Sequence, residues 1–167
     1  MNMKIKASIA FLGLVALGFA PVAMAEATTK LTGVHNCCGS CKKSIEGTVA
    51  KAGAKATAEK DTVTITAADD AGVKKAVSAL VDAGYFAKGL DAGPALSEVK
   101  AKSITVEGPH LCCPKCVDGF NKAAKAAAGV TKTDAKKGAT TVVVEGDVSP
   151  KALLDALHEA GFNAKVK

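Results

Sequence analysis

A short motif, HNCCGSC at residues 35–41, returns as HLCCPKC at residues 110–116. A second pair of matching segments, AGYFAK at 83–88 and AGFNAK at 160–165, follows the two motifs in the same order. Markers that recur in the same order at nearly the same spacing indicate a tandem duplication. The sequence therefore predicts two copies of one fold.

The boundary between the copies is also visible. The segment DAGPALS at residues 91–97 has the Gly-Pro composition of a short linker. We expect a first domain at 26–91, a linker at 92–101 and a second domain at 102–167.

Apolar periodicity and turn residues predict the same order of elements in both copies. In the first copy we expect a strand at 29–34, a helix at 41–52, strands at 54–59 and 62–67, a helix at 71–83 and a strand at 85–90. In the second copy we expect a strand at 103–107, a helix at 116–128, strands at 130–134 and 140–145, a helix opened by Ser149-Pro150 and a strand at 162–166. This βαββαβ order predicts an α+β protein with two tandem ferredoxin-like domains, each with two helices on one face of a four-stranded antiparallel sheet.

The first 25 residues have the features of a secretory signal peptide. Lys4 and Lys6 precede an apolar stretch at 7–20, and the small-residue sequence AMA at 23–25 suits cleavage. The apolar stretch is short for a membrane span. We therefore expect an exported protein, periplasmic or secreted, with no stable membrane insertion after cleavage.

The basic balance of the chain does not indicate a nucleic-acid partner. All 22 basic residues are Lys, aromatic residues make up 4%, and Trp is absent. Bidentate recognition of bases and phosphates depends on Arg, and single-stranded nucleic acids are held by aromatic stacking. The net charge of +6 is better explained by a solvated lysine surface.

All six cysteines lie in the two HxCCxxC motifs. Structural disulfides are the usual interpretation in an exported protein, but three thiols in each copy is an odd number. Three thiolates and one imidazole match a tetrahedral Cys₃His site, and soft sulfur ligands favour Cu(I) or Zn(II). We expect about one ion for each copy, with these metal ligands: His35, Cys37, Cys38 and Cys41 in the first, and His110, Cys112, Cys113 and Cys116 in the second.

A βαββαβ repeat with CxxC between its first strand and first helix resembles the heavy-metal-associated domain. That domain occurs in copper chaperones, in the N-terminal tails of metal-pumping ATPases and in periplasmic mercury-binding proteins. Its pattern is G-M-x-C-x-x-C, and the two cysteines fall on Cys38/Cys41 and Cys113/Cys116. The Met position holds Asn36 or Leu111, and the next position gains a cysteine, Cys37 or Cys112. The resemblance implies a carrier of Cu(I)-, Zn(II)- or Hg(II)-type ions whose partner is a membrane metal pump or another metal-binding protein.

These features predict a metal chaperone, scavenger or buffer and not an enzyme. The alternative is a periplasmic thiol-disulfide oxidoreductase that uses the CxxC pairs, although no proline is placed as the cis-Pro of a thioredoxin-type site would be. Tyr85 and Phe162 are expected near the metal loop or in the core. His158, remote from the cysteines in sequence, is expected on the surface or in packing.

Overall fold

The computed structural model describes residues 26–91 and 93–167, and the predicted signal peptide at 1–25 lies outside the described residues. The N-terminal half contains β1 (Ala27–Leu31), α1 (Gly39–Lys51), β2 (Lys55–Glu59), β3 (Thr62–Ala67) and α2 (Asp70–Asp82). Its antiparallel sheet has the order β1-β3-β2.

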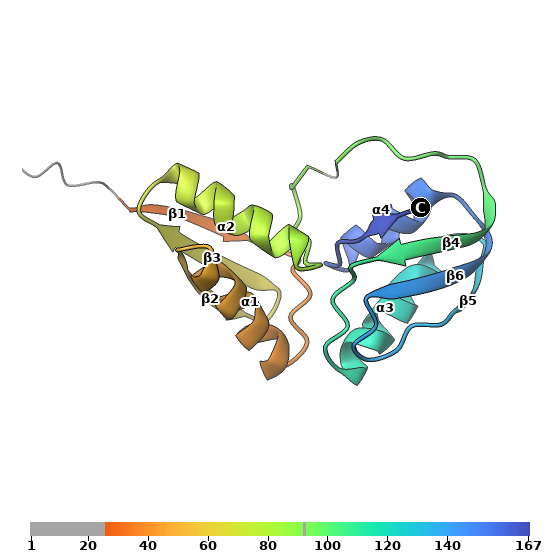
Figure 1. The fold of residues 1–167 in the computed structure, drawn as a ribbon, viewed down its shortest axis with the longest axis horizontal. Helices are drawn as coiled ribbons and strands as arrows, with labels where there is room; N and C mark the ends of the chain where they lie inside the picture. Colours follow the sequence, from red (N-terminus) through yellow and green to blue (C-terminus); the bar gives the residue numbers. More distant parts are fainter. Residues whose placement is uncertain (1–25, 92) are drawn as a thin grey trace, which may run out of the picture.

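The C-terminal half repeats this order and adds a strand. It contains β4 (Ala101–Glu107), α3 (Pro114–Ala126), β5 (Val130–Thr133), β6 (Thr141–Val148), α4 (Pro150–Glu159) and β7 (Lys165–Val166). Its antiparallel sheet has the order β5-β6-β4-β7. In both halves the two helices pack side by side and cover one face of the sheet (Figure 1). The prediction of a mixed α and β protein with antiparallel sheets is therefore confirmed.

Three of the helices have local signals at their first residues, although α3 begins at Pro114 where the sequence predicted Cys116. The Asp69 carboxylate accepts a hydrogen bond from the Gly72 backbone N–H at the start of α2, and the Ser149 hydroxyl accepts one from Ala152 N–H at the start of α4. Pro150 and Pro114 occupy the first turns of α4 and α3, where a proline interrupts no helical hydrogen bond.

The predicted strand at 85–90 is wrong, and the N-terminal sheet has three strands where four were expected. Its backbone hydrogen bonds are divided between the halves: Phe86 N–H donates to the Gly161 carbonyl of the other half, and Lys88 N–H donates to the Thr32 carbonyl just after β1. Leu90 N–H then donates back to Ala87, and Gly89 has a φ of +82°. This turn ends the extended conformation. The last strand of the C-terminal half also shortens, from the predicted 162–166 to Lys165–Val166.

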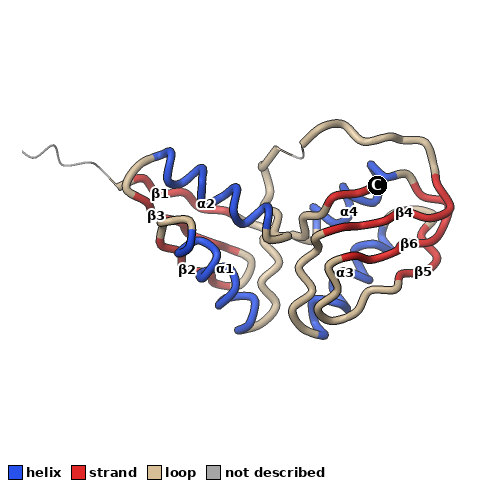
Figure 2. The backbone as a smooth tube through the Cα atoms, in the orientation of Figure 1, coloured by secondary structure: helices blue, strands red, loops and turns tan. Residues whose placement is uncertain are grey.

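The segments that follow α2 and α4 pair with each other at the centre of the molecule. Tyr85 and Phe162 form an isolated antiparallel bridge, and Asn163 N–H donates to the Gly84 carbonyl over 2.9 Å. Figure 2 shows these loops meeting between the two sets of strands. Each half therefore uses the other to satisfy the backbone of its own last segment.

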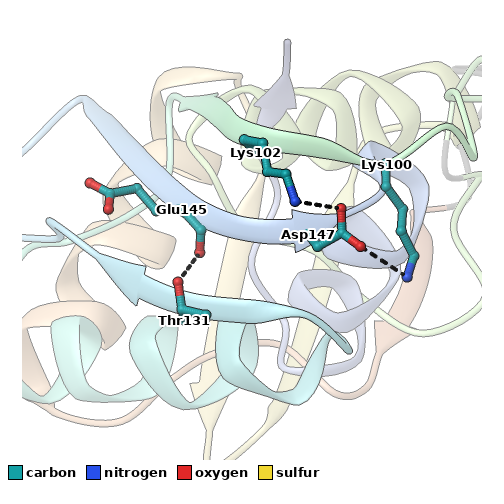
Figure 3. Close-up of polar contacts among 5 residues, drawn as sticks. All are labelled: Lys100, Lys102, Thr131, Glu145 and Asp147. Atoms are coloured by element: carbon teal, nitrogen blue, oxygen red, sulfur yellow. Dashed lines mark hydrogen bonds and ion pairs between the residues drawn. The ribbon is translucent and has the colours of Figure 1, made fainter.

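The far end of the C-terminal sheet is held by polar contacts. The Asp147 carboxylate on β6 forms ion pairs with Lys100 Nζ at 3.5 Å and Lys102 Nζ at 3.4 Å (Figure 3). Thr131 Oγ1 donates a hydrogen bond to the Glu145 carbonyl. All these side chains are exposed, so the ion pairs contribute little to stability.

Two apolar clusters form the core, one under each sheet. Cys41 belongs to the N-terminal half by sequence but packs in the cluster of the C-terminal half. Within residues 26–91 and 93–167, no helix has the length and apolar character needed to cross a membrane.

Candidate metal centre

Each cysteine motif lies where an extended loop enters a helix. Cys38 caps α1 with a φ of −164°, and Cys113 caps α3 with a φ of −151°. Neither side chain caps its helix by a hydrogen bond. The free N–H groups of the first turn and the helix dipole favour negative charge at these ends. The two loops run side by side between the halves, so both positive helix ends face the same space (Figure 1).

Within each motif the sulfurs converge on the last cysteine. Cys41 Sγ lies 3.6 Å from Cys37 Sγ and 3.9 Å from Cys38 Sγ. In the second motif, Cys116 lies 3.6 Å from Cys112 and 3.5 Å from Cys113. This pattern follows from the helix, because the third residue of the first turn points back towards the loop that precedes it.

The two motifs also contact each other directly. Cys41 and Cys116, the two buried cysteines, have their sulfurs 3.4 Å apart. Four more contacts of 3.6–3.9 Å cross between the motifs: Cys37–Cys113, Cys37–Cys116, Cys38–Cys113 and Cys41–Cys112. All six cysteines are free thiols. The molecule therefore has one cluster of six thiols, where the sequence suggested two separate sets.

The two histidines of the motifs border this cluster in different ways. His35 stacks on Phe162 with ring centroids 4.1 Å apart, and its buried Nε2 has no hydrogen-bond partner. His110 packs against Tyr85, whose hydroxyl lies 2.7 Å from His110 Nε2. Each ring has a nitrogen within 4.8 Å of three cysteine sulfurs. Both rings are therefore placed to ligate an ion held by the thiols.

The thiols influence one another's protonation. Cys41 and Cys116 share a hydrogen bond in which either sulfur can be the donor, and this contact lowers the pKa of Cys41 and raises the pKa of Cys116. Burial raises the pKa of Cys37, and it raises the pKa of Cys112 to about 12. The cysteines that hold protons in the absence of metal must release them when they bind an ion.

The inner two cysteines are closed to solvent and the outer four are not. Cys41 and Cys116 are both 0% exposed, whereas the other four are half-buried and Cys37 lines a cavity of about 360 Å³. This cavity lies between the halves, with His35 and Asn36 from one side and Glu159 and Ala160 from the other. Lys42, next to Cys41 in sequence, pairs with Glu46 over 3.7 Å and is half-exposed.

The structure brings all eight predicted ligand residues together in one region, and their role as ligands stays a prediction. Tyr85 and Phe162, expected near the metal loop or in the core, are fully buried, and each packs on a histidine of the opposite half. Their role in bringing the halves together was not predicted. His158, predicted either on the surface or in packing, is packed: it stacks on Phe86 with ring centroids 3.6 Å apart. The matching segments at 83–88 and 160–165 were the signal, but a repeat alone does not say that its copies contact each other.

No protein-family model matches the chain. No curated protein matches it. Among solved structures, it is similar to the solution structure of the N-terminal soluble domains of Bacillus subtilis CopA, with a TM-score of 0.33 and 19% sequence identity. That match covers 86% of this chain and 95% of the other. At this TM-score the likeness assigns no function to the chain.

Proposed function

We propose that this protein binds soft metal ions, Cu(I), Zn(II) or Hg(II)-type, through its cysteine motifs and serves as a metal chaperone, scavenger or buffer outside the cytoplasm. One observation carries the proposal: six free thiols lie in one cluster with sulfur–sulfur contacts of 3.4–3.9 Å.

These separations suit a metal–thiolate centre. Sulfurs bound at about 2.3 Å to one tetrahedral ion lie about 3.8 Å from one another. Thiolates and imidazoles are the ligands preferred by Cu(I) and Zn(II). A buried cluster of thiols without metal has to keep most of its protons, because several thiolates at these distances would repel one another. Metal binding removes that repulsion.

The finer features of the proposal come from the sequence. Each half is a ferredoxin-like domain of the heavy-metal-associated kind, at 26–91 and 102–167, and residues 1–25 direct export. The element order of the C-terminal half supports this assignment. Ions are exchanged with a metal pump or another metal-binding protein, and the cavity beside Cys37 gives a partner's thiols a route to the cluster. The stoichiometry of one ion for each motif stays a prediction.

A thiol-disulfide oxidoreductase fits the cluster less well. Such an enzyme needs one cysteine of its CxxC pair accessible to a substrate disulfide. Cys38 and Cys113 are half-buried, and their sulfurs lie 3.6 Å apart across the two motifs.

The test is metal competition on reduced, signal-free protein under anaerobic conditions. We expect the protein to retain Cu(I) against a chromophoric Cu(I) chelator and to carry metal by elemental analysis, whereas a variant with all six cysteines changed to Ser carries none. We expect no catalysis of insulin reduction. Loss of Cu(I) and Zn(II) to weak chelators, together with insulin reduction, would overturn the proposal.

A further inference from the structure

We propose that the two motifs hold a single polynuclear Cu(I)–thiolate cluster, shared by both halves, in place of one ion for each motif. This inference rests on the proposed function, because it specifies how the bound metal is arranged.

The sulfur contacts define the faces of the cluster. Three sets of three sulfurs are in mutual contact, and each set is a trigonal site for one Cu(I) ion. The sets are Cys37–Cys41–Cys116, Cys41–Cys112–Cys116 and Cys37–Cys113–Cys116. Every set takes cysteines from both motifs.

Neither motif forms such a site alone. In the first motif, Cys37 and Cys38 both contact Cys41, but no contact joins Cys37 to Cys38 within the described residues. In the second motif, Cys112 and Cys113 both contact Cys116 in the same open arrangement. A three-coordinate Cu(I) ion therefore gains its third sulfur from the opposite half.

Counting bonds gives the capacity. When six thiolates form two bonds each on average and each ion has three sulfurs, the cluster holds about four Cu(I) ions. The three triangular faces account for three of them. The fourth ion lies at the ring of four sulfurs from Cys37, Cys41, Cys38 and Cys113, so Cys38 also becomes a ligand.

Charge also bears on how the cluster fills. With all six thiols deprotonated, two Cu(I) ions leave a net charge of about −4 in a partly buried site and four ions leave about −2, so a two-ion form requires the remaining thiols to keep their protons. The N-termini of α1 and α3 both face the cluster, and each contributes roughly half a positive charge. The ions enter as Cu(I), so no electron is transferred, and each thiol that binds releases its proton to solvent.

The test is anaerobic titration of the reduced, signal-free chain with tetrakis(acetonitrile)copper(I), followed by native mass spectrometry. We expect the metal-free and the three- to four-copper species to dominate, with little two-copper protein, and short copper–copper scattering in X-ray absorption. Saturation at two ions, filled independently and without copper–copper scattering, would overturn the shared cluster but leave the proposed function intact. Failure to retain Cu(I) would overturn both.

Two variants with equal numbers of thiols sharpen the test. Cys116 belongs to all three triangular faces, and Cys38 belongs to none. We expect Cys116→Ser to abolish the three- and four-copper species and Cys38→Ser to keep three ions. Independent sites predict the same loss in both variants, because each substitution breaks one CxxC pair. Circular dichroism verifies that both variants are folded. If Cys116→Ser does not fold, the titration of the unsubstituted protein decides the proposal.

Discussion

At the scale of single residues, the environments of His35 and His110 differ by one hydroxyl group. The residues that stack on them, Tyr85 and Phe162, occupy matching positions in the repeat, but only Tyr85 offers a hydrogen bond. His110 Nε2 is thereby satisfied, whereas His35 Nε2 is buried without a partner. An unsatisfied buried polar atom is costly. A bond from His35 to a metal ion would remove that cost.

We therefore expect a double variant, His35→Ala with His110→Ala, to bind Zn(II) more weakly while it keeps its Cu(I) affinity. Zinc prefers four ligands and accepts imidazole, whereas Cu(I) is satisfied by three thiolates. The loss for Zn(II) should be about 1–3 kcal/mol, the range for a lost buried polar partner. Competition with chelators for each metal measures it. Equal, small losses for both metals would show that the histidines are not ligands.

The single variants refine this prediction. His35→Ala should account for the larger share of the zinc loss, because its Nε2 has no other partner in the described chain. His110→Ala should lose less, since Tyr85 already holds that ring. The reverse order would assign the ligand role to His110.

At the scale of elements, the turns after α2 and α4 hold the halves together through glycine. Gly84 has a φ of +86°, and a Cβ there would lie 2.5 Å from the Gly108 carbonyl oxygen and 2.6 Å from His110 N. Gly161 repeats this arrangement, since a Cβ would collide with His35 N and Gly33 O. The close approach of the backbones requires glycine at both positions.

Gly84→Ala should therefore lower the free energy of unfolding by more than about 3 kcal/mol, because backbone strain and a collision with rigid backbone add together. Gly53→Ala is the matched control: its φ is +89°, but its Cβ would meet open space. That control should lose only about 1–2 kcal/mol. Urea unfolding measures both, and equal losses would mean that the halves do not pack closely at Gly84.

The packing of α4 against the other half makes the stability dependent on pH. His158 stacks on Phe86, and its Nε2 forms a hydrogen bond with Asn163 Oδ1. Burial lowers the pKa of the His158 imidazole. Asp155, on the same helix, opposes that shift only in part. Because the folded pKa lies below the unfolded value of 6.5, protonation favours the unfolded chain. The stability is complete above pH 6.5 and is lost as the pH falls through the folded pKa.

The metal-free protein should accordingly melt at lower temperature at pH 5 than at pH 7, and His158→Gln should show a weaker dependence. His35, whose pKa is also lowered by burial, contributes with the same sign and keeps part of the effect in the variant. Thermal unfolding followed by circular dichroism at the two pH values measures the difference. A variant with the full pH dependence of the parent would exclude His158 as its source.

At the scale of the whole molecule, the linker is not what keeps the two halves together. The central bridge between Tyr85 and Phe162 and the hydrogen bond from Asn163 to the Val81 carbonyl hold them, together with the thiol cluster. The linker runs along α4, where Ser97 accepts a hydrogen bond from Lys151 N–H. It then reaches Val99, which is 78% exposed.

A protease site inserted after Val99 should let the chain be cut without separating its halves. With Cu(I) bound, the two pieces should associate at least about tenfold more tightly than without it, because ions bound by both motifs stabilise only the paired form. Size-exclusion chromatography over a dilution series, with and without Cu(I), measures the two dissociation constants. Equal constants would show that the metal does not join the halves.

The sequence predicted most elements because their signals are local. Asp69 and Ser149 mark helix starts through hydrogen bonds to residues three positions away. The segment at 85–90 was misassigned because only Lys88 pairs beside β1, through Thr32, while Phe86 donates to Gly161 of the other half, a contact that leaves no local signal. The sequence could not decide whether the two motifs share their thiols, because the CxxC spacing fixes the distance from Cys38 to Cys41 but not from Cys41 to Cys116.

The uneven exposure of the six thiols has a kinetic consequence. A competing ligand reaches the four half-buried cysteines first, while Cys41 and Cys116 are fully buried. At the ions bound by these outer cysteines, the competitor replaces the protein sulfurs one at a time. This gives a fast phase of release whose rate rises with the concentration of the competitor. The metal behind these ions waits for the halves to separate, so its release is slow and independent of that concentration. Residence time, more than affinity, would then decide how much of the bound metal a partner receives.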